Sequence, residues 1–179
     1  MANIIMTVIG TDRSGLVDQL SATITDHGGN WLESRMSRLS GYFAGILRVS
    51  VPEEQLVSME AALQHLTGDS LQLVIAHETS GVDEGPQKAL HLEVLGPDHP
   101  GIVHDISHAL ATKNIGISSI STDCRDGAMS SERIFSADIN ISVPVDVSVE
   151  SIRDELEDLA NELMVDITMD DLEGSVVQI

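Results

Sequence analysis

The chain repeats one of its own segments, and this repeat constrains its fold more than any other feature. Residues 9–17, IGTDRSGLV, return at 95–103 as LGPDHPGIV, an offset of 86 residues. Further along, Ser50-Val51-Pro52 returns at 142–144 with an offset of 92, so the second copy carries six extra residues between these landmarks. Self-similarity on this scale indicates two copies of one domain.

A polar segment separates the two copies. Residues 79–87, TSGVDEGPQ, combine glycine and proline with polar side chains, a composition that is typical of linkers. We therefore predict domain 1 at residues 1–79, a linker at 80–88 and domain 2 at 89–179. The six extra residues fall near 125–132, RDGAMSSE, which predicts a longer hairpin in the second copy.

Both copies predict the same order of secondary structure. Apolar and β-branched runs indicate strands, and apolar residues at helical spacing indicate helices. The first copy predicts strands at 4–9, 31–38, 42–51 and 71–75, with helices that begin near Leu16 and Leu56; the second predicts strands at 90–95, 115–124, 133–143 and 164–169, with helices at 100–113 and 149–163. This order predicts an α+β protein of two tandem ferredoxin-like βαββαβ domains, each an antiparallel sheet with both helices on one face.

Charge and aromatic content exclude several functions. Lys and Arg together number 9 against 29 Asp and Glu, a formal net charge of −20, so the basic clusters that attract nucleic acids and anionic membranes are missing. Aromatic residues make up 2% of the chain, too few for a platform on which bases stack. A single cysteine, Cys124, excludes an intrachain disulfide and fits a reducing compartment. We expect a cytoplasmic protein that contacts neither nucleic acid nor membrane directly.

The junction between the first strand and first helix of each copy carries the motif Gly-x-Asp-x-x-Gly-[Leu/Ile]-Val. In this strand–helix order the motif resembles the ACT domain, a small-molecule-sensing module. Two such copies with nothing else attached resemble the glycine cleavage system transcriptional repressor family. The resemblance implies a regulatory protein, not an enzyme and without a cofactor, that senses a small amino acid such as glycine and controls a transcription factor by protein contact. Exposed strand edges favour a homodimer.

An amino-acid ligand at the junction has a physical basis. The glycines allow close approach of the backbone, and the following helix offers free N–H groups to a carboxylate. Asp12 and Asp98 are expected to cap these helices and also to receive the ammonium group. The resemblance adds Asn30, across a domain interface; Gly116 matches it in the second copy and has no side chain, so the first copy is expected to supply the better site. Alternatively, Asn30 is an ordinary turn residue. The predicted ligand-binding residues are Gly10, Asp12, Arg13, Ser14, Gly15, Leu16, Asn30, Gly96, Asp98, His99, Gly101 and Ile102.

Two histidines leave an enzymatic or metal-binding alternative open. His104 and His108 have the spacing of a zinc-protease motif, with Asp105 in place of the glutamate base. Both point away from the apolar face of their helix, and a catalytic zinc needs three protein ligands in a shaped pocket. We therefore favour surface histidines, and we predict no metal site.

Two non-enzymatic alternatives also remain. An RNA-recognition module has the same element order, but it needs aromatic and basic residues on its central strands. There this chain offers only Trp31, Tyr42, Phe43 and Phe135, without a basic field. The other is an interaction or oligomerisation module that binds no small molecule. The predicted helix at 149–163 has an acidic face that is either a plain solvated surface or a docking site for a basic transcription factor. That face comprises Asp154, Glu155, Glu157, Asp158 and Glu162.

Overall fold

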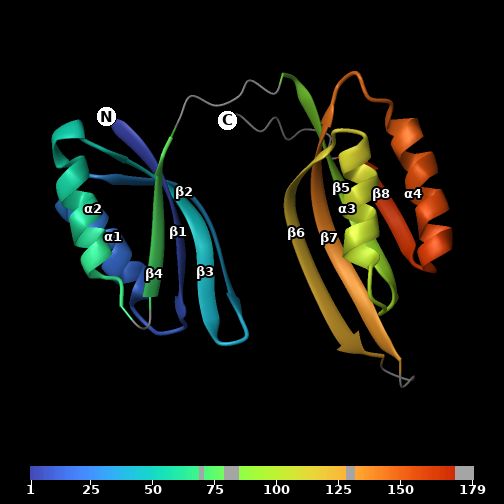
Figure 1. Cartoon of the computed structure of the whole chain (residues 1–179), viewed down its shortest axis with the longest axis horizontal. Helices are drawn as coiled ribbons and strands as arrows, with labels where there is room; N and C mark the ends of the chain where they lie inside the picture. The colour runs from blue at the N-terminus through green and yellow to red at the C-terminus, as the bar shows by residue number, and fades with distance from the viewer. Residues whose placement is uncertain (69–70, 79–84, 128–131, 172–179) are drawn as a thin grey trace. The chain divides into compact units, whose positions relative to one another are not determined.

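The computed structural model describes residues 1–68, 71–78, 85–127 and 132–171 (Figure 1). The chain divides into two compact units, Met1–Val82 and Asp83–Ile179, and each has the order βαββαβ. The elements of the first unit are β1 (Ala2–Thr11), α1 (Leu16–Asp26), β2 (Asn30–Leu39), β3 (Tyr42–Val51), η1 (Glu53–Gln55, one 3₁₀ turn), α2 (Leu56–His65) and β4 (Leu71–His77). Those of the second are β5 (Gln87–Pro97), α3 (Ile102–Thr112), β6 (Gly116–Asp126), β7 (Arg133–Pro144), α4 (Val149–Leu163) and β8 (Asp166–Asp171).

Each unit contains a four-stranded antiparallel sheet. The strand orders are β2-β3-β1-β4 in the first unit and β6-β7-β5-β8 in the second, so the first and third strands of each unit are central. Both helices of a unit lie on the same face of its sheet (Figure 1). The predicted α+β fold of two ferredoxin-like units is therefore confirmed.

The core of each unit lies between its sheet and its helices. Side chains of a strand alternate between the two faces of the sheet, and this alternation is strict along β1 and β5. Ile4, Met6 and Val8 pack in the first core, and Leu90, Leu92 and Val94 pack in the second. The residues between them face the side of the sheet that carries no helix. In β5 these outward residues are His91, Glu93 and Leu95.

Several element boundaries differ from the sequence prediction. β5 begins at Gln87, inside the segment that we expected to be linker, because Gln87 and Lys88 pair with the end of β7. The long hairpin of the second unit turns between Asp126 and Arg133, and its residues 128–131 lie outside the described ranges. None of the helices in the described part of the chain is long and apolar enough to cross a membrane.

Candidate functional site

The β1–α1 and β5–α3 junctions have the same backbone geometry in the two units. Gly15 and Gly101 precede the helices with left-handed φ angles of 86° and 109°, a conformation that only glycine adopts without strain. No side chain caps either helix, so the prediction that Asp12 and Asp98 act as caps is wrong. Among the residues that the structure describes, no side chain accepts a hydrogen bond from the N–H groups of the first helical turn at either junction.

The two aspartates turn toward the hairpin between the second and third strands instead. Oδ2 of Asp12 lies 2.7 Å from Nε of Arg38 in β2, and the Asp12 N–H donates to the carbonyl of Gly41. Asp98 is held less tightly, with Oδ2 3.8 Å from Nη1 of Arg133. Each carboxylate therefore pairs with an arginine instead of accepting a hydrogen bond from the N–H groups of the helix. Sequence analysis missed Arg38 and Arg133 because they are distant from the junctions along the chain. Their positions in the predicted hairpins were the available signal.

The charges around the two helix starts differ. In the first unit, Nη2 of Arg13 donates to Oε1 of Gln19 at 2.9 Å, which holds a positive charge beside the first turn of α1. Within the described ranges, no atom outside Gly15 and its two chain neighbours lies within 4 Å of the position that a Cβ on Gly15 would take. In the second unit, Asp105 stands in the place of Gln19, and its Oδ2 lies 3.3 Å from the corresponding position on Gly101. The start of α3 therefore already has a carboxylate beside it.

Four of the predicted ligand-binding residues belong to the packing of the junctions. Leu16 and Ile102 are only 3% and 2% exposed and lie in the two cores. Gly10 is buried at the end of β1. Gly96 is covered by Val165, whose Cγ1 lies 2.7 Å from the position of a Cβ on that glycine. Of the predicted ligand-binding residues, Arg13, Ser14 and Gly15 face solvent at the first junction.

Asn30 lies at the opposite end of its sheet from the first junction. It pairs with Ser50 of β3, which pairs in turn with Asn3 of β1. The junction follows Thr11, so at about 3.3 Å per residue the two places are about 26 Å apart along β1. Asn30 therefore cannot complete the junction of its own unit, and a contribution across a domain interface remains a prediction. No atom lies within 4 Å of the Cβ position on Gly116, which matches Asn30 in the second unit.

His99 ties the second junction to the end of α4. Its Nε2 lies 2.8 Å from the carbonyl oxygen of Leu163, and its Nδ1 lies 3.2 Å from that of Pro100. Two carbonyl acceptors can both be satisfied only by a doubly protonated ring. The hydrogen bond to Leu163 and then that to Pro100 raise the pKa of His99, and the negative charges of Asp98 and Asp105 add to the effect.

We expect the stability of the second unit to fall as the pH rises past neutrality. Because the folded-state pKa is raised, the contribution of His99 is complete below about pH 6.5, the pKa of an unfolded histidine, and is lost as the pH rises through the folded-state value. The urea midpoint of the second unit, followed by hydrogen exchange, should decrease as the pH rises above about 6.5. A His99→Gln variant should show a smaller decrease, and an equal decrease in both proteins would assign the effect to another group.

His104 and His108 lie on the exposed side of α3. Their rings are stacked with centroids 6.0 Å apart and planes 16° from parallel. Within the described ranges, these two histidines do not converge with a third side chain that could complete a metal site. The geometry gives the zinc-enzyme alternative no support.

The aromatic residues do not form a platform for RNA bases. Trp31 is on β2, an edge strand, so its assignment to a central strand is wrong. Trp31 and Phe43 pack against the first core, and Phe135 is buried in the second. Tyr42 is 56% exposed and is the one aromatic side chain with a largely open surface. The RNA-recognition alternative therefore loses its contact surface.

The acidic face of α4 is smaller than predicted. Glu155 forms an ion pair with Lys113 of α3, with 2.7 Å between Oε2 and Nζ, and it is partly covered. The exposed acidic residues of the helix that remain from the predicted set are Asp154, Glu157, Asp158 and Glu162. We call these four residues the α4 acidic face.

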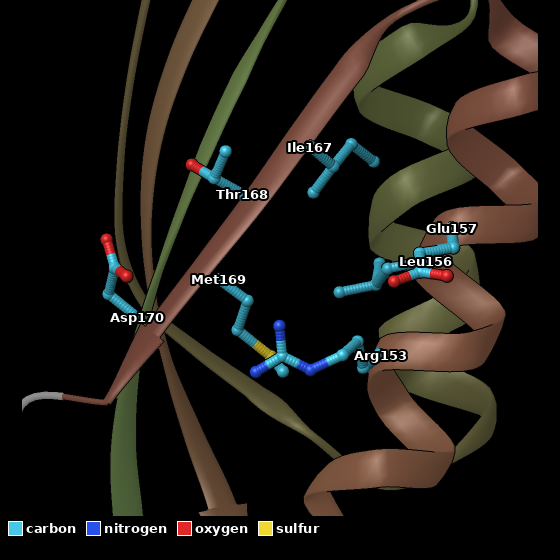
Figure 2. A pocket seen from close by; sticks show the side chains of 7 residues that line it. All are labelled: Arg153, Leu156, Glu157, Ile167, Thr168, Met169 and Asp170. Atoms are coloured by element: carbon cyan, nitrogen blue, oxygen red, sulfur yellow. The ribbon is translucent and has the colours of Figure 1, made fainter.

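A groove of about 280 Å³ runs between α4 and the edge strand β8 (Figure 2). Leu156, Ile167 and Met169 point into it, whereas the side chains of Thr168 and Asp170 point to the other side of the strand (Figure 2). Arg153 and Glu157 complete its lining. None of the predicted ligand-binding residues lines this groove, so it does not mark the predicted ligand site.

Comparisons with known proteins agree with this architecture. Residues 2–75 match the family model described as the ACT domain. A crystal structure of an unknown protein from Galdieria sulphuraria is similar over 96% of this chain and 98% of its own, with 24% identity and a TM-score of 0.80. A protein described as a "putative glycine cleavage system transcriptional repressor" is similar over 94% of this chain and 96% of its own, with 20% identity and a TM-score of 0.68.

The search of curated proteins gave no match. At these identities the two solved structures establish a shared fold rather than a shared activity. The family model covers the first unit, and the second unit repeats its element order, sheet order and junction motif. The first unit is therefore an ACT domain, and the second unit is ACT-like in its architecture.

Proposed function

We propose that this protein is a non-catalytic regulator whose first unit binds a small amino acid at the β1–α1 junction. The observation that carries the proposal is the open, uncapped start of α1 with the charge of Arg13 held beside it. Membership of the first unit in the ACT family supports a sensing role. The likeness to the glycine cleavage system protein makes glycine the first ligand to test.

The first junction has complementary partners for both charges of an amino acid. The start of a helix carries the equivalent of about half a positive charge, and with Arg13 it forms a favourable place for a carboxylate. Asp12 offers a negative charge for the ammonium group. Its Oδ2 is engaged by Arg38, and within the described residues no hydrogen bond or ion pair engages its Oδ1. Asp18 also lies in the first turn of α1. Because it is exposed to solvent, its negative charge only partly offsets the positive charge at the start of the helix.

The second junction is the weaker site, because Asp105 places a negative charge where a ligand carboxylate would bind. His99 adds to this difference, since both of its ring nitrogens already face backbone carbonyls. Sequence analysis also favoured the first copy, but on the strength of Asn30. The charges at the helix starts are an independent reason for the same choice.

Exchanging the residues that distinguish the two junctions should exchange their affinities. We expect Gln19→Asp to weaken amino-acid binding by about two- to thirtyfold, the range of charge effects at a helix end. Asp105→Gln should strengthen or create binding in the second unit by a similar factor. Calorimetric titration of the full chain with glycine, serine and the other common amino acids measures both effects.

Asn30→Ala is the matched control for this titration. Unchanged affinity would show that each junction binds its ligand within its own unit, whereas a loss would show that Asn30 serves the junction of another unit. A wild-type protein that binds no amino acid would contradict the sensing role and favour the interaction module without a ligand.

We further propose that regulation proceeds by protein contact with a transcription factor, and that the protein is a homodimer. The α4 acidic face supports a basic partner, because its four carboxylates are exposed. Exposed apolar side chains of the first sheet, including Ile46 and Val74 on its helix-free side, support assembly through that sheet. Light scattering during the amino-acid titration reports the oligomeric state with and without ligand.

A further inference from the structure

We propose that the helix-free face of the second sheet carries a binding site for a divalent transition-metal ion, formed by His91, Glu93 and Asp138. One ligand atom of each side chain lies within 4.8 Å of the other two. His91 and Glu93 are two residues apart on β5 and so share a face, and Asp138 lies directly opposite Glu93 on β7. The site is separate from both junctions and does not depend on the proposed function.

The distances from His91 suit a metal ion better than a direct ion pair. Its Nε2 lies 3.6 Å from Oδ1 of Asp138 and 3.8 Å from Oε1 of Glu93. A charged hydrogen bond between such groups is about 2.7–2.9 Å long, so neither carboxylate is hydrogen-bonded to the ring. Two ligands bound at about 2.0–2.1 Å to a tetrahedral zinc lie about 3.4 Å apart. Small side-chain adjustments therefore suffice to place an ion between these atoms.

The other ring nitrogen of His91 is held in the way that metal-ligating histidines require. Nδ1 lies 3.2 Å from Oδ1 of Asn140, and the amide nitrogen of Asn140 donates to Oγ of Ser119 at 2.8 Å. With the amide in this orientation, Nδ1 carries a proton and donates it, so that in the neutral ring the lone pair is on Nε2, toward the two carboxylates. A partner that fixes the tautomer in this way is a regular feature of metal sites.

The negative charge around the three residues also favours binding of a cation. Glu93 and Asp138 are directly opposite each other on adjacent strands, where like charges destabilise a sheet. Asp170 lies opposite His91 on the other neighbour, β8. Within the described residues, no lysine or arginine forms an ion pair with these carboxylates. A divalent cation bound between the three residues offsets the charge of the two carboxylates and accepts the lone pair of a neutral imidazole.

The ligand set indicates which ions fit. One imidazole and two carboxylates suit zinc and its first-row neighbours, whereas magnesium and calcium prefer oxygen ligands alone. The side chain of His91 is 21% exposed, and those of Glu93 and Asp138 are 63% and 65% exposed, so the site is open on one side. Water or a side chain from another molecule can fill the remaining coordination positions.

Calorimetric titration of the metal-free, tag-free full chain with zinc chloride tests the proposal. We expect one ion per chain, and His91→Asn should weaken its binding by about 100-fold or more, since loss of an outer partner alone costs 10–100-fold. Glu93→Gln and Asp138→Asn should each weaken it, and Asn140→Leu should weaken it by about tenfold through His91. Binding of Co²⁺, followed by its visible absorption, reports the coordination geometry of the bound ion.

The variant with both His104→Ala and His108→Ala is the matched control, because it removes two exposed histidines elsewhere in the same unit. Its zinc affinity should equal that of the wild-type protein. Zinc binding that survives His91→Asn, or that is lost in the double variant, would overturn the proposal. So would a wild-type protein that takes up no zinc, and circular dichroism confirms that each variant is folded.

Discussion

Replacing Leu92 with alanine should destabilise the second unit by about 2–5 kcal/mol, the range for a buried leucine that leaves a cavity. Leu92 is fully buried at the centre of β5, where it packs in the core of its unit. A loss of this size is a large fraction of the total stability of a domain. Urea unfolding combined with hydrogen exchange measures the loss separately for peptides of each unit.

The same experiment tests whether the two units are independent domains. Each unit has its own core, so Leu92→Ala should accelerate exchange in the second unit and leave the first unchanged. Met6→Ala, at the matching position of β1, should do the reverse. Leu95→Ala is the control on the same strand, because Leu95 is 52% exposed and its loss should change stability by no more than about 0.5 kcal/mol. Equal acceleration in both units after Leu92→Ala would mean that they unfold together.

Much of the fold could be predicted because the sequence contains two copies of the same pattern. The repeat divides the chain, and each strand pattern in one copy supports the same pattern in the other. The helix at 149–163 was placed correctly at both ends, since its apolar spacing is regular and Ser148 caps its start. Strand ends were less well predicted: Gln87 and Lys88 are polar, and only their pairing with β7 makes them part of β5.

The candidate site was harder to predict, because the hydrogen-bond and ion-pair partners of its side chains are distant along the chain. Asp12 and Asp98 have the position of helix caps, yet arginines from the following hairpin bind them instead. Asn30 follows α1 in sequence but lies at the far end of the sheet from the junction, because α1 leads the chain from the end of β1 back to the level of Asn3 before β2 begins.

The proposed metal site was also difficult to predict from the sequence, because its residues come from different strands. His91 and Glu93 form a His-x-Glu pattern on a strand, which puts both side chains on one face of the sheet. This pattern could have indicated part of the site from the sequence. Asp138 is far away along the chain, and the register of β5 with β7 is what brings it opposite Glu93. The two residues that orient His91 lie on β7 and β6, so the arrangement depends on three strands together.

Gly96→Ala should destabilise the second unit by about 1–3 kcal/mol, the usual cost of overpacking. The added Cβ would lie 2.7 Å from Cγ1 and 2.9 Å from Cα of Val165. Valine is stiff about its first torsion, and its Cα cannot move without the backbone, so relief requires β5 to move away from the residue that directly precedes β8. Urea unfolding of the second unit measures the loss.

Gly116→Ala is the matched control for this substitution, because no atom lies within 4 Å of its added Cβ. It should leave stability unchanged or raise it by up to about 1 kcal/mol, through a less flexible unfolded chain. A Gly96→Ala protein as stable as the Gly116→Ala protein would contradict the packing role of Gly96. If Gly96→Ala is destabilised as expected, the motif glycine of the second unit is required by the close approach of Val165, the residue before β8. The ligand-binding role that the motif suggested then rests on the residues that follow it, from Asp98 to Gly101 in this unit and from Asp12 to Gly15 in the first.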